Sequence, residues 1–425
     1  MVRQVCTSFT QPVVARFVGG WVRDKLMGKD NDDIDIAIDC DCSTFLEKFE
    51  KIFPHTKCWI VRAKPHMSKY LTVGHISISA DRNNLDVCAL KEYDYNENFT
   101  SIGTIESDIR RRDFTINSIY LNVITNKVED FVGGINDIKN GIIRTILEPK
   151  VAYDYDPMIV VRAIRFATVL SFKIEQKAFE GILENKFSIE HISRERVTQE
   201  VMKMMKSENV VRGLELMVET NIFNAIFAPP PFDEKEFFNR VKIALSRCND
   251  KSYYLILILS ILYKDLSKFS LDIKVEQGKK KKDGPRIHQK VTQFLKMPAK
   301  VSRDVCHLLK SVKTVSEMQR PLTRLAVGRW LRETDEVWEL TSCLLFDPQT
   351  YQFFNDELVP FVRKENLTEV IHMKPFASAK ELAKIHGMEN LGAQNKKFML
   401  QLIEWQIENP GKTINDYSEY VNSQK

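Results

Sequence analysis

Residues 16–39, RFVGGWVRDKLMGKDNDDIDIAID, constrain the fold of this chain more than any other stretch. Residues 13–18 are valine-rich and end at a Gly-Gly pair, and a short helical pattern follows. Asp33 and Asp35 then alternate with isoleucines, as in a half-buried strand. The pattern predicts a strand, a glycine turn, a helix and a second strand.

Two carboxylates are expected side by side on the second of these strands. The strand period of two places Asp33 and Asp35 on one face and the isoleucines on the other. Neighbouring like charges repel, and either a bound divalent cation or heavy solvation keeps both ionised. Oxygen ligands favour magnesium. The pair therefore predicts a magnesium site, and a solvated acidic turn is the alternative.

The glycine turn before the helix has the features of a phosphate site. Gly19 and Gly20 lack a Cβ, so a ligand can approach the backbone closely, and the next helix offers its N-terminus to a phosphate. Arg23 adds a cation nearby. Asp86, on a later predicted strand, is either a third carboxylate for this site or an ordinary solvated aspartate.

The composition of the 425 residues gives bounds rather than a function. There are 62 basic and 57 acidic residues, so nucleic-acid binding has to come from a local patch. Eight scattered cysteines without paired spacing indicate reduced thiols, and neither a membrane span nor a signal peptide is predicted. We expect a protein of the cytoplasm and/or nucleus, with a mitochondrial form arising through an alternative start.

Residues 107–123, SDIRRRDFTINSIYLNV, place cationic donors next to an acceptor in an apolar pattern. Arg112, Asp113 and Asn117 suit recognition of a triphosphate and a sugar, whereas a solvated charge run is the alternative.

A second informative helix is expected from Asp156, an N-cap followed by proline. Arg162 and Arg165 lie three residues apart in this apolar helix, and each needs an anionic partner, either a ligand or a protein carboxylate. Beyond Glu208 the apolar periodicity predicts helices only.

GGWVRDKLMGKDNDDIDIA, RRRDFTINS, DPMIVVRAIRFA and ISRERVTQEV follow one another in this order. With these motifs the chain resembles the class II tRNA nucleotidyltransferases, the CCA-adding family of the DNA polymerase β-like superfamily, and especially its fungal members. The resemblance implies an α+β fold. Residues 1–148 would form a catalytic head with a mixed five-stranded sheet, residues 149–210 a helical neck that reads the base, and residues 211–425 a helical body and tail that bind tRNA.

The resemblance also implies roles for individual residues. Asp33 and Asp35 would hold two magnesium ions. The residues expected to bind the nucleotide are Gly19, Gly20, Arg23, Arg112, Asp113, Asn117, Asp156, Arg162 and Arg165. Asp113 and Asn117 match the ribose-reading positions, and the last three match the helix that templates the base. The implied reaction is template-independent addition of C and/or A, from CTP and/or ATP, to the 3′ acceptor end of tRNA by a monomer.

One motif departs from the family pattern. Where the family has Glu-Asp-x-x-Arg, this chain has Tyr155, Asp156 and, in place of the arginine, Ile159. Isoleucine has no donor or acceptor for a base edge. The segment 86–112 is also shorter than in fungal relatives. The sequence is compatible with full CCA addition and with partial addition. Of the two partial reactions, we expect the addition of CC alone rather than the addition of A alone. A poly(A) polymerase of the same class and a catalytically silent RNA-binding paralogue are the alternatives.

Overall fold

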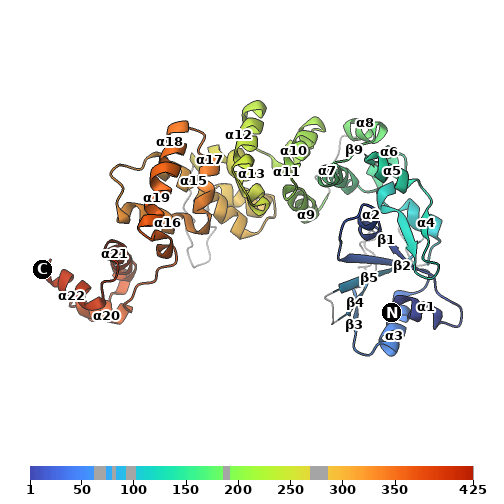
Figure 1. The fold of residues 1–425 in the computed structure, drawn as a ribbon, viewed down its shortest axis with the longest axis horizontal. Helices are drawn as coiled ribbons and strands as arrows, with labels where there is room; N and C mark the ends of the chain where they lie inside the picture. Colours follow the sequence, from blue (N-terminus) through green and yellow to red (C-terminus); the bar gives the residue numbers. More distant parts are fainter. Residues whose placement is uncertain (62–72, 79–82, 92–101, 185–191, 269–285, 425) are drawn as a thin grey trace. The chain divides into compact units, whose positions relative to one another are not determined.

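The computed structural model describes residues 1–61, 73–78, 83–91, 102–184, 192–268 and 286–424 (Figure 1). The sequence also predicts a strand over 70–78, an irregular polar loop over 91–103 and a basic loop over 278–287. The start of this strand and most of both loops lie outside the described residues. By its internal contacts the chain forms two compact units. The first comprises Met1–Ser193 and Arg212–Ala225, and the second comprises Arg194–Val211 and Ile226–Lys425.

The first unit is built on a mixed sheet with strand order β3-β4-β5-β2-β1-β6-β7. Its strands are β1 (Ala15–Val18), β2 (Asp33–Ile38), β3 (Lys57–Val61), β4 (Val73–Ile78), β5 (Asn83–Ala89), β6 (Ile119–Asn122) and β7 (Val128–Asp130). Only the central β2–β5 pair is parallel. The mixed sheet is confirmed, but the count of five strands is wrong, because the short edge strands β3 and β7 extend the sheet to seven. Edge strands this short leave a weak period-two signal.

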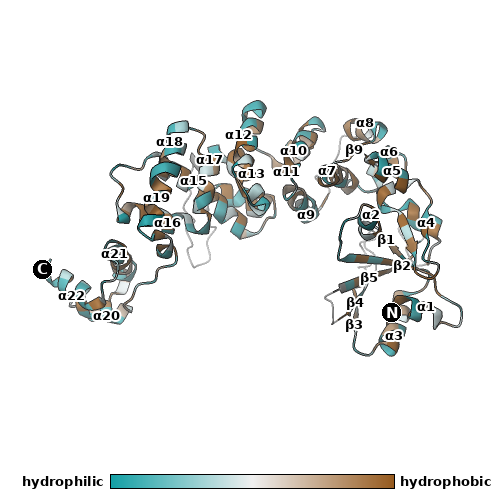
Figure 2. Ribbon diagram, in the orientation of Figure 1, coloured by the Kyte–Doolittle hydropathy of each residue, from teal (hydrophilic) through white to brown (hydrophobic). Residues whose placement is uncertain are grey.

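One face of this sheet carries a hydrophobic core. The isoleucines of β2 and the apolar residues of β4 and β5 pack there against α1 (Val2–Thr7) and α3 (Cys42–Ile52), chiefly Phe45 and Phe49. On the other face, α4 (Ile105–Arg110) covers β1 and β6. Ile109 of this helix belongs to the same hydrophobic cluster as Tyr120 of β6. In Figure 2 the helices of this unit carry both hydrophobic and hydrophilic residues, as helices packed on one side of a sheet do.

Further helices complete the first unit: α2 (Gly20–Leu26), α5 (Gly134–Asn140), α6 (Pro149–Tyr155), α7 (Met158–Leu170) and α8 (Gln176–Glu184). The neck predicted over 149–210 is not entirely helical. Lys173–Ile174 forms strand β9, which pairs in parallel with β8 (Ile142–Ile143). A strand of two residues is too short to show a period in the sequence.

Every described element of the second unit is helical, as predicted beyond Glu208. α10 (Val210–Glu219) and α11 (Ile222–Phe227) span the boundary between the units. The others are α9 (Arg194–Met205), α12 (Glu234–Ser246), α13 (Tyr254–Leu262), α14 (Arg286–His288), α15 (Ala299–Ser316), α16 (Arg324–Thr334), α17 (Thr341–Leu344), α18 (Pro348–Phe353), α19 (Val359–Lys364), α20 (Ala379–Ile385), α21 (Asn395–Glu408) and α22 (Ile414–Ser423). None of the helices in the described part of the chain is long and apolar enough to cross a membrane.

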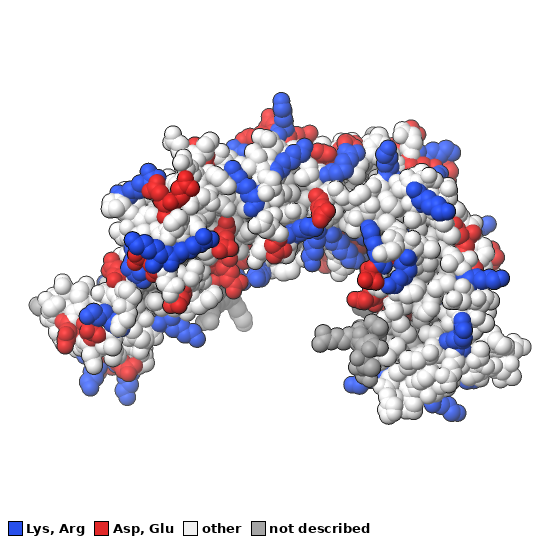
Figure 3. Space-filling view, in the orientation of Figure 1, with Lys and Arg blue, Asp and Glu red and all other residues white. Residues whose placement is uncertain are grey.

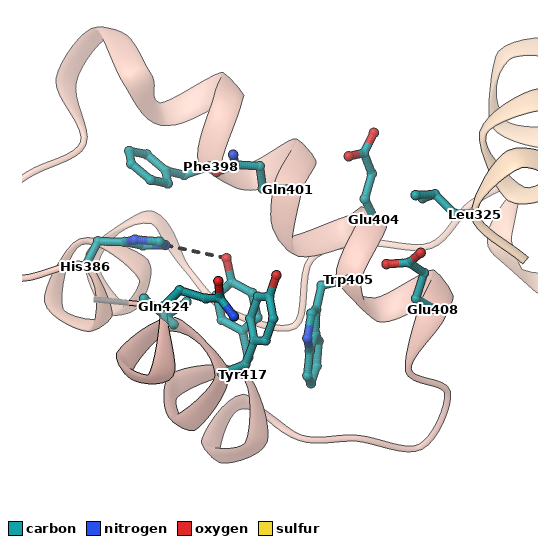
Figure 4. Close-up of a pocket in the computed structure, with 11 residues that line it drawn as sticks. Leu325, His386, Phe398, Gln401, Glu404, Trp405, Glu408, Tyr417 and Gln424 are labelled. Carbon is teal, nitrogen blue, oxygen red and sulfur yellow. Dashed lines mark hydrogen bonds between the residues drawn. The ribbon is translucent and has the colours of Figure 1, made fainter.

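The last three helices enclose a small aromatic core and a pocket of about 450 Å³ (Figure 4). Trp405 and Tyr417 pack at 5.2 Å between ring centroids, and Tyr417 contacts His386. Glu404 and Glu408 also line the pocket, and no lysine or arginine of the described residues lines it. These carboxylates make the pocket a poor site for phosphate groups.

Candidate active site

A cluster of three carboxylates lies at the parallel strand pair in the centre of the sheet. The pairing of β2 with β5 sets Asp35 opposite Asp86, and Asp33 lies two residues before Asp35 on β2. One oxygen from each of the three carboxylates lies within 4.8 Å of the others. The isoleucines between and after the β2 aspartates pack on the opposite face. The expected side-by-side placement of Asp33 and Asp35 is confirmed, and Asp86 joins them.

The electrostatics of this cluster suit a divalent cation. Burial, together with the negative charges of Asp33 and Asp86, raises the pKa of Asp35 to about 6 against the opposing cation of Arg112. A metal ion would offset both the burial and the repulsion. Because all three groups offer oxygen atoms, the cluster fits magnesium.

The glycine turn lies directly against this cluster. Gly19 has a φ of +78°, which only glycine adopts freely, and a Cβ at this position would lie 3.2 Å from Oδ2 of Asp35. Helix α2 begins at the next residue, Gly20. The backbone of the turn is thus placed beside the carboxylates, as the sequence predicts.

A line of polar contacts connects α2, the turn after α4, and α7. Arg23 is 7% exposed and donates to Oδ1 of Asp24 at 2.8 Å and to Oδ1 of Asn117 at 2.6 Å. Asn117 donates to Oδ1 of Asp113 at 3.1 Å. Oδ2 of Asp113 lies 2.7 Å from a guanidinium nitrogen of Arg162. Four of the predicted site residues therefore form one connected set.

This set retains unused hydrogen-bonding capacity. Oδ2 of Asp113 and Nε of Arg162 are buried and have no hydrogen-bond partner among the residues that the structure describes. The close contact between the two side chains is an ion pair without hydrogen-bond geometry. Buried polar atoms of this kind are usually satisfied, so these two are suited to a polar ligand.

Three arginines converge on one aromatic ring of α7. The guanidinium carbons of Arg23, Arg162 and Arg165 lie 5.1, 5.8 and 3.7 Å from the ring centroid of Phe166. Phe166 in turn packs edge-on against Phe114. The predicted cations of the glycine-turn motif and of the second helix are thus brought together around a buried apolar centre.

Arg112 is held in a separate cluster behind the carboxylates. Its Nε donates to Oδ2 of Asp108 at 3.0 Å and to the hydroxyl of Tyr120 at 2.9 Å, and Arg111 pairs with the same fully buried Asp108. Burial raises the pKa of Asp108, but the two guanidinium groups outweigh it and hold that pKa below its ordinary value. Through its effect on Asp35, Arg112 acts on the carboxylate cluster.

Asp156 and Ile159 stand at the start of α7. Oδ1 of Asp156 accepts from the backbone nitrogen of Met158 at 3.1 Å, which confirms the predicted helix-capping contact. Ile159 is 6% exposed and belongs to the buried side of the helix. The first cation of α7 is therefore Arg162, one turn later.

The sequence reasoning missed three residues near the site. Asp108 is spaced three and four residues before Arg111 and Arg112, and this spacing on a helix is a signal that was available. Tyr120 and His75 gave no such signal, because their partners come from other strands or helices.

The comparisons with known proteins agree with this geometry. The family model described as the poly(A) polymerase head domain matches residues 15–144, and the one described as a probable RNA- and SrmB-binding site of polymerase A matches residues 171–235. The tRNA nucleotidyltransferase cca1 of Schizosaccharomyces pombe is 29% identical over 95% of this chain and 89% of its own length. The chain is a homologue of the tRNA nucleotidyltransferases.

Other relatives match the chain over nearly its whole length. The mitochondrial CCA tRNA nucleotidyltransferase of Candida glabrata is 26% identical over 97% of this chain and 91% of its own. The crystal structure of the Bacillus stearothermophilus CCA-adding enzyme in complex with CTP matches with a TM-score of 0.69 and 21% identity, over 100% of this chain and 95% of that one. The predicted family and the α+β class are confirmed, and the chain is an enzyme.

Proposed function

We propose that this tRNA nucleotidyltransferase adds C and/or A, from CTP and/or ATP, to the 3′ end of tRNA without a nucleic-acid template. The observation that carries the proposal is the cluster of Asp33, Asp35 and Asp86 beside the connected set that runs from Arg23 to Arg162. The names of the full-length relatives support tRNA as the acceptor, and the CTP complex of the Bacillus enzyme supports a nucleoside triphosphate as the donor.

Asp33 and Asp35 would hold two magnesium ions at this cluster. When bound there, magnesium supplies Lewis-acid chemistry that favours attack by the 3′-hydroxyl and departure of pyrophosphate. The chain's own residues hold the reacting groups in place, and the reaction needs no covalent nucleophile. Asp86, opposite Asp35 in the sheet, would complete the set of oxygen ligands, and the register of the two strands supports this role.

The remaining site residues would bind the incoming nucleotide. The backbone at Gly19 lies against Asp35, Arg23 lies beside Gly20, and the cation of Arg112 acts on Asp35, so these groups suit the triphosphate. In this proposal Asp113 and Asn117 read the ribose. Oδ2 of Asp113, which is buried without a hydrogen-bond partner in the described chain, is suited to accept from a ribose hydroxyl.

Asp156, Arg162 and Arg165 would read the base from helix α7. The arginine expected one turn before Arg162 is replaced by the buried Ile159, so one donor to the base edge is missing. We propose that the enzyme performs only part of CCA addition, with CC addition favoured over A addition. The apparent shortness of segment 86–112 supports the same choice, as inferred from the sequence.

The tRNA would lie on helical parts of the chain, with residues 1–148 as the head, 149–210 as the neck, and 211–425 as the body and tail. Figure 3 shows lysines and arginines interspersed with acidic residues over the visible face of the helical elements. Binding through phosphate contacts distributed in this way should weaken steeply with salt. A monomer acting in the cytoplasm and/or nucleus is part of the proposal, and the mitochondrial relatives support an additional mitochondrial form.

One assay tests the function directly. Purified protein receives tRNA ending at the discriminator base, at C or at CC, and each substrate is offered CTP or ATP separately. We expect CTP to extend the tRNAs that end at the discriminator base and at C. The tRNA that ends at CC should be extended little. Ordered synthesis of all three nucleotides would contradict partial addition, and no extension of any substrate would favour the silent RNA-binding paralogue.

The poly(A) polymerase alternative has a separate test. An enzyme of that kind should extend an unstructured RNA as well as tRNA and should add long runs of A. Equal extension of both RNAs with ATP would support it.

A further inference from the structure

The register of the sheet aligns one residue from every strand in a row that passes through Asp35. From one edge to the other, the row consists of Trp59, His75, Asp86, Asp35, Val18, Tyr120 and Glu129. Residues paired across neighbouring strands project from the same face. On its side toward the edge of the sheet, the carboxylate cluster is therefore followed by His75 on β4 and then by Trp59 on the edge strand β3.

His75 is hydrogen-bonded to the third carboxylate of the cluster. Its Nδ1 lies 2.7 Å from Oδ1 of Asp86, and both side chains are partly buried. An ionised carboxylate only accepts hydrogen bonds, so Nδ1 carries the hydrogen and donates it. This bond uses Oδ1 of Asp86 and leaves its second oxygen for another ligand.

Trp59 supports the imidazole from the other side. The indole and imidazole rings stack with centroids 5.2 Å apart and planes inclined by 21°. The two residues are also register partners on β3 and β4. A ring held between a stacking partner and a carboxylate has little freedom to turn, so the donor stays aimed at Asp86.

We propose that His75 is a positioning residue for Asp86 and that Trp59 fixes the plane of its imidazole. Asp86 is thereby held in one rotamer, with an oxygen presented to the metal that Asp33 and Asp35 also bind. The inference rests on the proposed function, because it assigns His75 and Trp59 to the same metal cluster. Partners that orient a ligand in this way typically change metal affinity by about tenfold to a hundredfold.

Manganese binding tests the proposal without any reaction. Mn²⁺ takes the same oxygen ligands as magnesium, and its free form is counted by electron paramagnetic resonance of the full-length protein without nucleotide or RNA. We expect His75→Leu, which removes the donor, to weaken Mn²⁺ binding by about tenfold or more. His75→Asn should retain most of the affinity, because its amide places a donor near the position of Nδ1. Trp59→Leu should weaken Mn²⁺ binding, whereas Trp59→Phe, which keeps an aromatic ring, should retain it.

A double-variant cycle separates positioning from a general structural effect. Asp86→Asn should lose affinity, and adding His75→Leu to it should cause no further loss, because His75 acts through Asp86. Ser77→Ala, two residues along β4 on the same face as His75, is the matched control and should bind Mn²⁺ as the wild type does.

The outcomes are distinguishable. Wild-type affinity in His75→Leu, or an equal further loss in the Asp86→Asn background, would overturn the positioning role. If Asp33→Asn and Asp86→Asn also bound Mn²⁺ like the wild type, the metal cluster of the proposed function would itself be wrong. Should His75→Leu fail to fold, as judged by circular dichroism, His75→Asn and the two Trp59 variants decide the proposal: loss of binding in His75→Asn or equal binding in both Trp59 variants counts against it.

Discussion

Arg162 lies 2.7 Å from Asp113 and joins helix α7 to the turn after α4. Asp113 is 8% exposed and Arg162 is partly exposed, so the pair combines a buried anchor with an accessible cation. We expect Arg162→Leu to raise the KM for the nucleotide by about tenfold to a hundredfold. This factor corresponds to the loss of one charge-assisted hydrogen bond between Arg162 and the nucleotide. Steady-state kinetics with Arg110→Leu, which changes an exposed arginine outside this set, provides the control. An unchanged KM would remove Arg162 from the nucleotide site.

Asp33→Ala and Asp35→Ala should each abolish nucleotide addition, by more than about a hundredfold, because each removes a carboxylate from the cluster proposed to bind magnesium. The fold and the affinity for tRNA should stay nearly intact, since the apolar side of β2 is unchanged. Radiolabelled nucleotide incorporation and filter binding measure the two properties. Asp32→Asn, an exposed neighbour outside the cluster, should behave as the wild type, and near-normal activity of either alanine variant would contradict the metal assignment.

The raised pKa of Asp35 predicts a signed dependence of stability on pH. Its folded pKa of about 6 exceeds the ordinary value of 3.8, so without metal the native state binds this proton more tightly than the unfolded state does. The resulting contribution to stability is present at low pH and is lost as the pH rises through about 6. In EDTA at pH 7, Asp35→Asn should therefore have a higher melting temperature than the wild type.

The same comparison at pH 5 is the internal control for that prediction. The wild-type carboxyl is then largely protonated, so the difference in melting temperature between the two proteins should narrow. A difference that is equal at both values of pH would show that the charge of Asp35 is not its cause.

Asp108 is the buried anion that holds Arg111, Arg112 and the Tyr120 hydroxyl together. Asp108→Ala leaves two partly buried guanidinium groups without this carboxylate, and breaking such a pair costs about 3 kcal/mol or more. Tyr120→Phe removes two hydrogen bonds, the one that the hydroxyl donates to Asp108 and the one that it accepts from Arg112, and should cost about 2 kcal/mol. Thermal unfolding of the full chain ranks the two variants, and a smaller effect for Asp108→Ala would contradict this account.

Ile159→Arg tests the reading of the base. The variant restores the missing guanidinium, and together with Tyr155→Glu it restores the family motif, so nucleotide use should broaden or sharpen. Because Ile159 is 6% exposed, an unpaired arginine there should also lower stability by a few kcal/mol. Separate incorporation assays with CTP and ATP, together with melting curves, measure the two effects. Identical nucleotide use in the wild type and in the folded variants would show that position 159 does not read the base.

The sequence allowed the local part of the site to be predicted and left the non-local part open. The alternation of Asp33 and Asp35 with isoleucines determines the face of the strand, and the Asp-Pro pair predicts the start of the second helix correctly. Both patterns depend only on neighbours along the chain.

The contributions of Asp86 and His75 depend instead on register between strands. β2 and β5 are separated by α3, β3 and β4, so nothing near Asp86 in the sequence shows that it pairs with Asp35. The partner of Arg162 was likewise undecided between a ligand and a protein carboxylate, and the structure supplies Asp113 while leaving one of its oxygens unsatisfied. The short strands β3, β7 and β9 were missed or miscounted because two to five residues carry little periodicity.

The parallel pairing of Asp35 with Asp86 has a consequence for how this gene can tolerate insertions and deletions. A one-residue slip of β5 against β2 would turn Asp86 into the hydrophobic core and bring Leu85 to the carboxylates, because side chains alternate between faces. A two-residue slip would preserve the alternation but move a different residue opposite Asp35. Single-codon length changes within these two strands should therefore be eliminated by selection even where every substitution of an apolar residue by another is accepted.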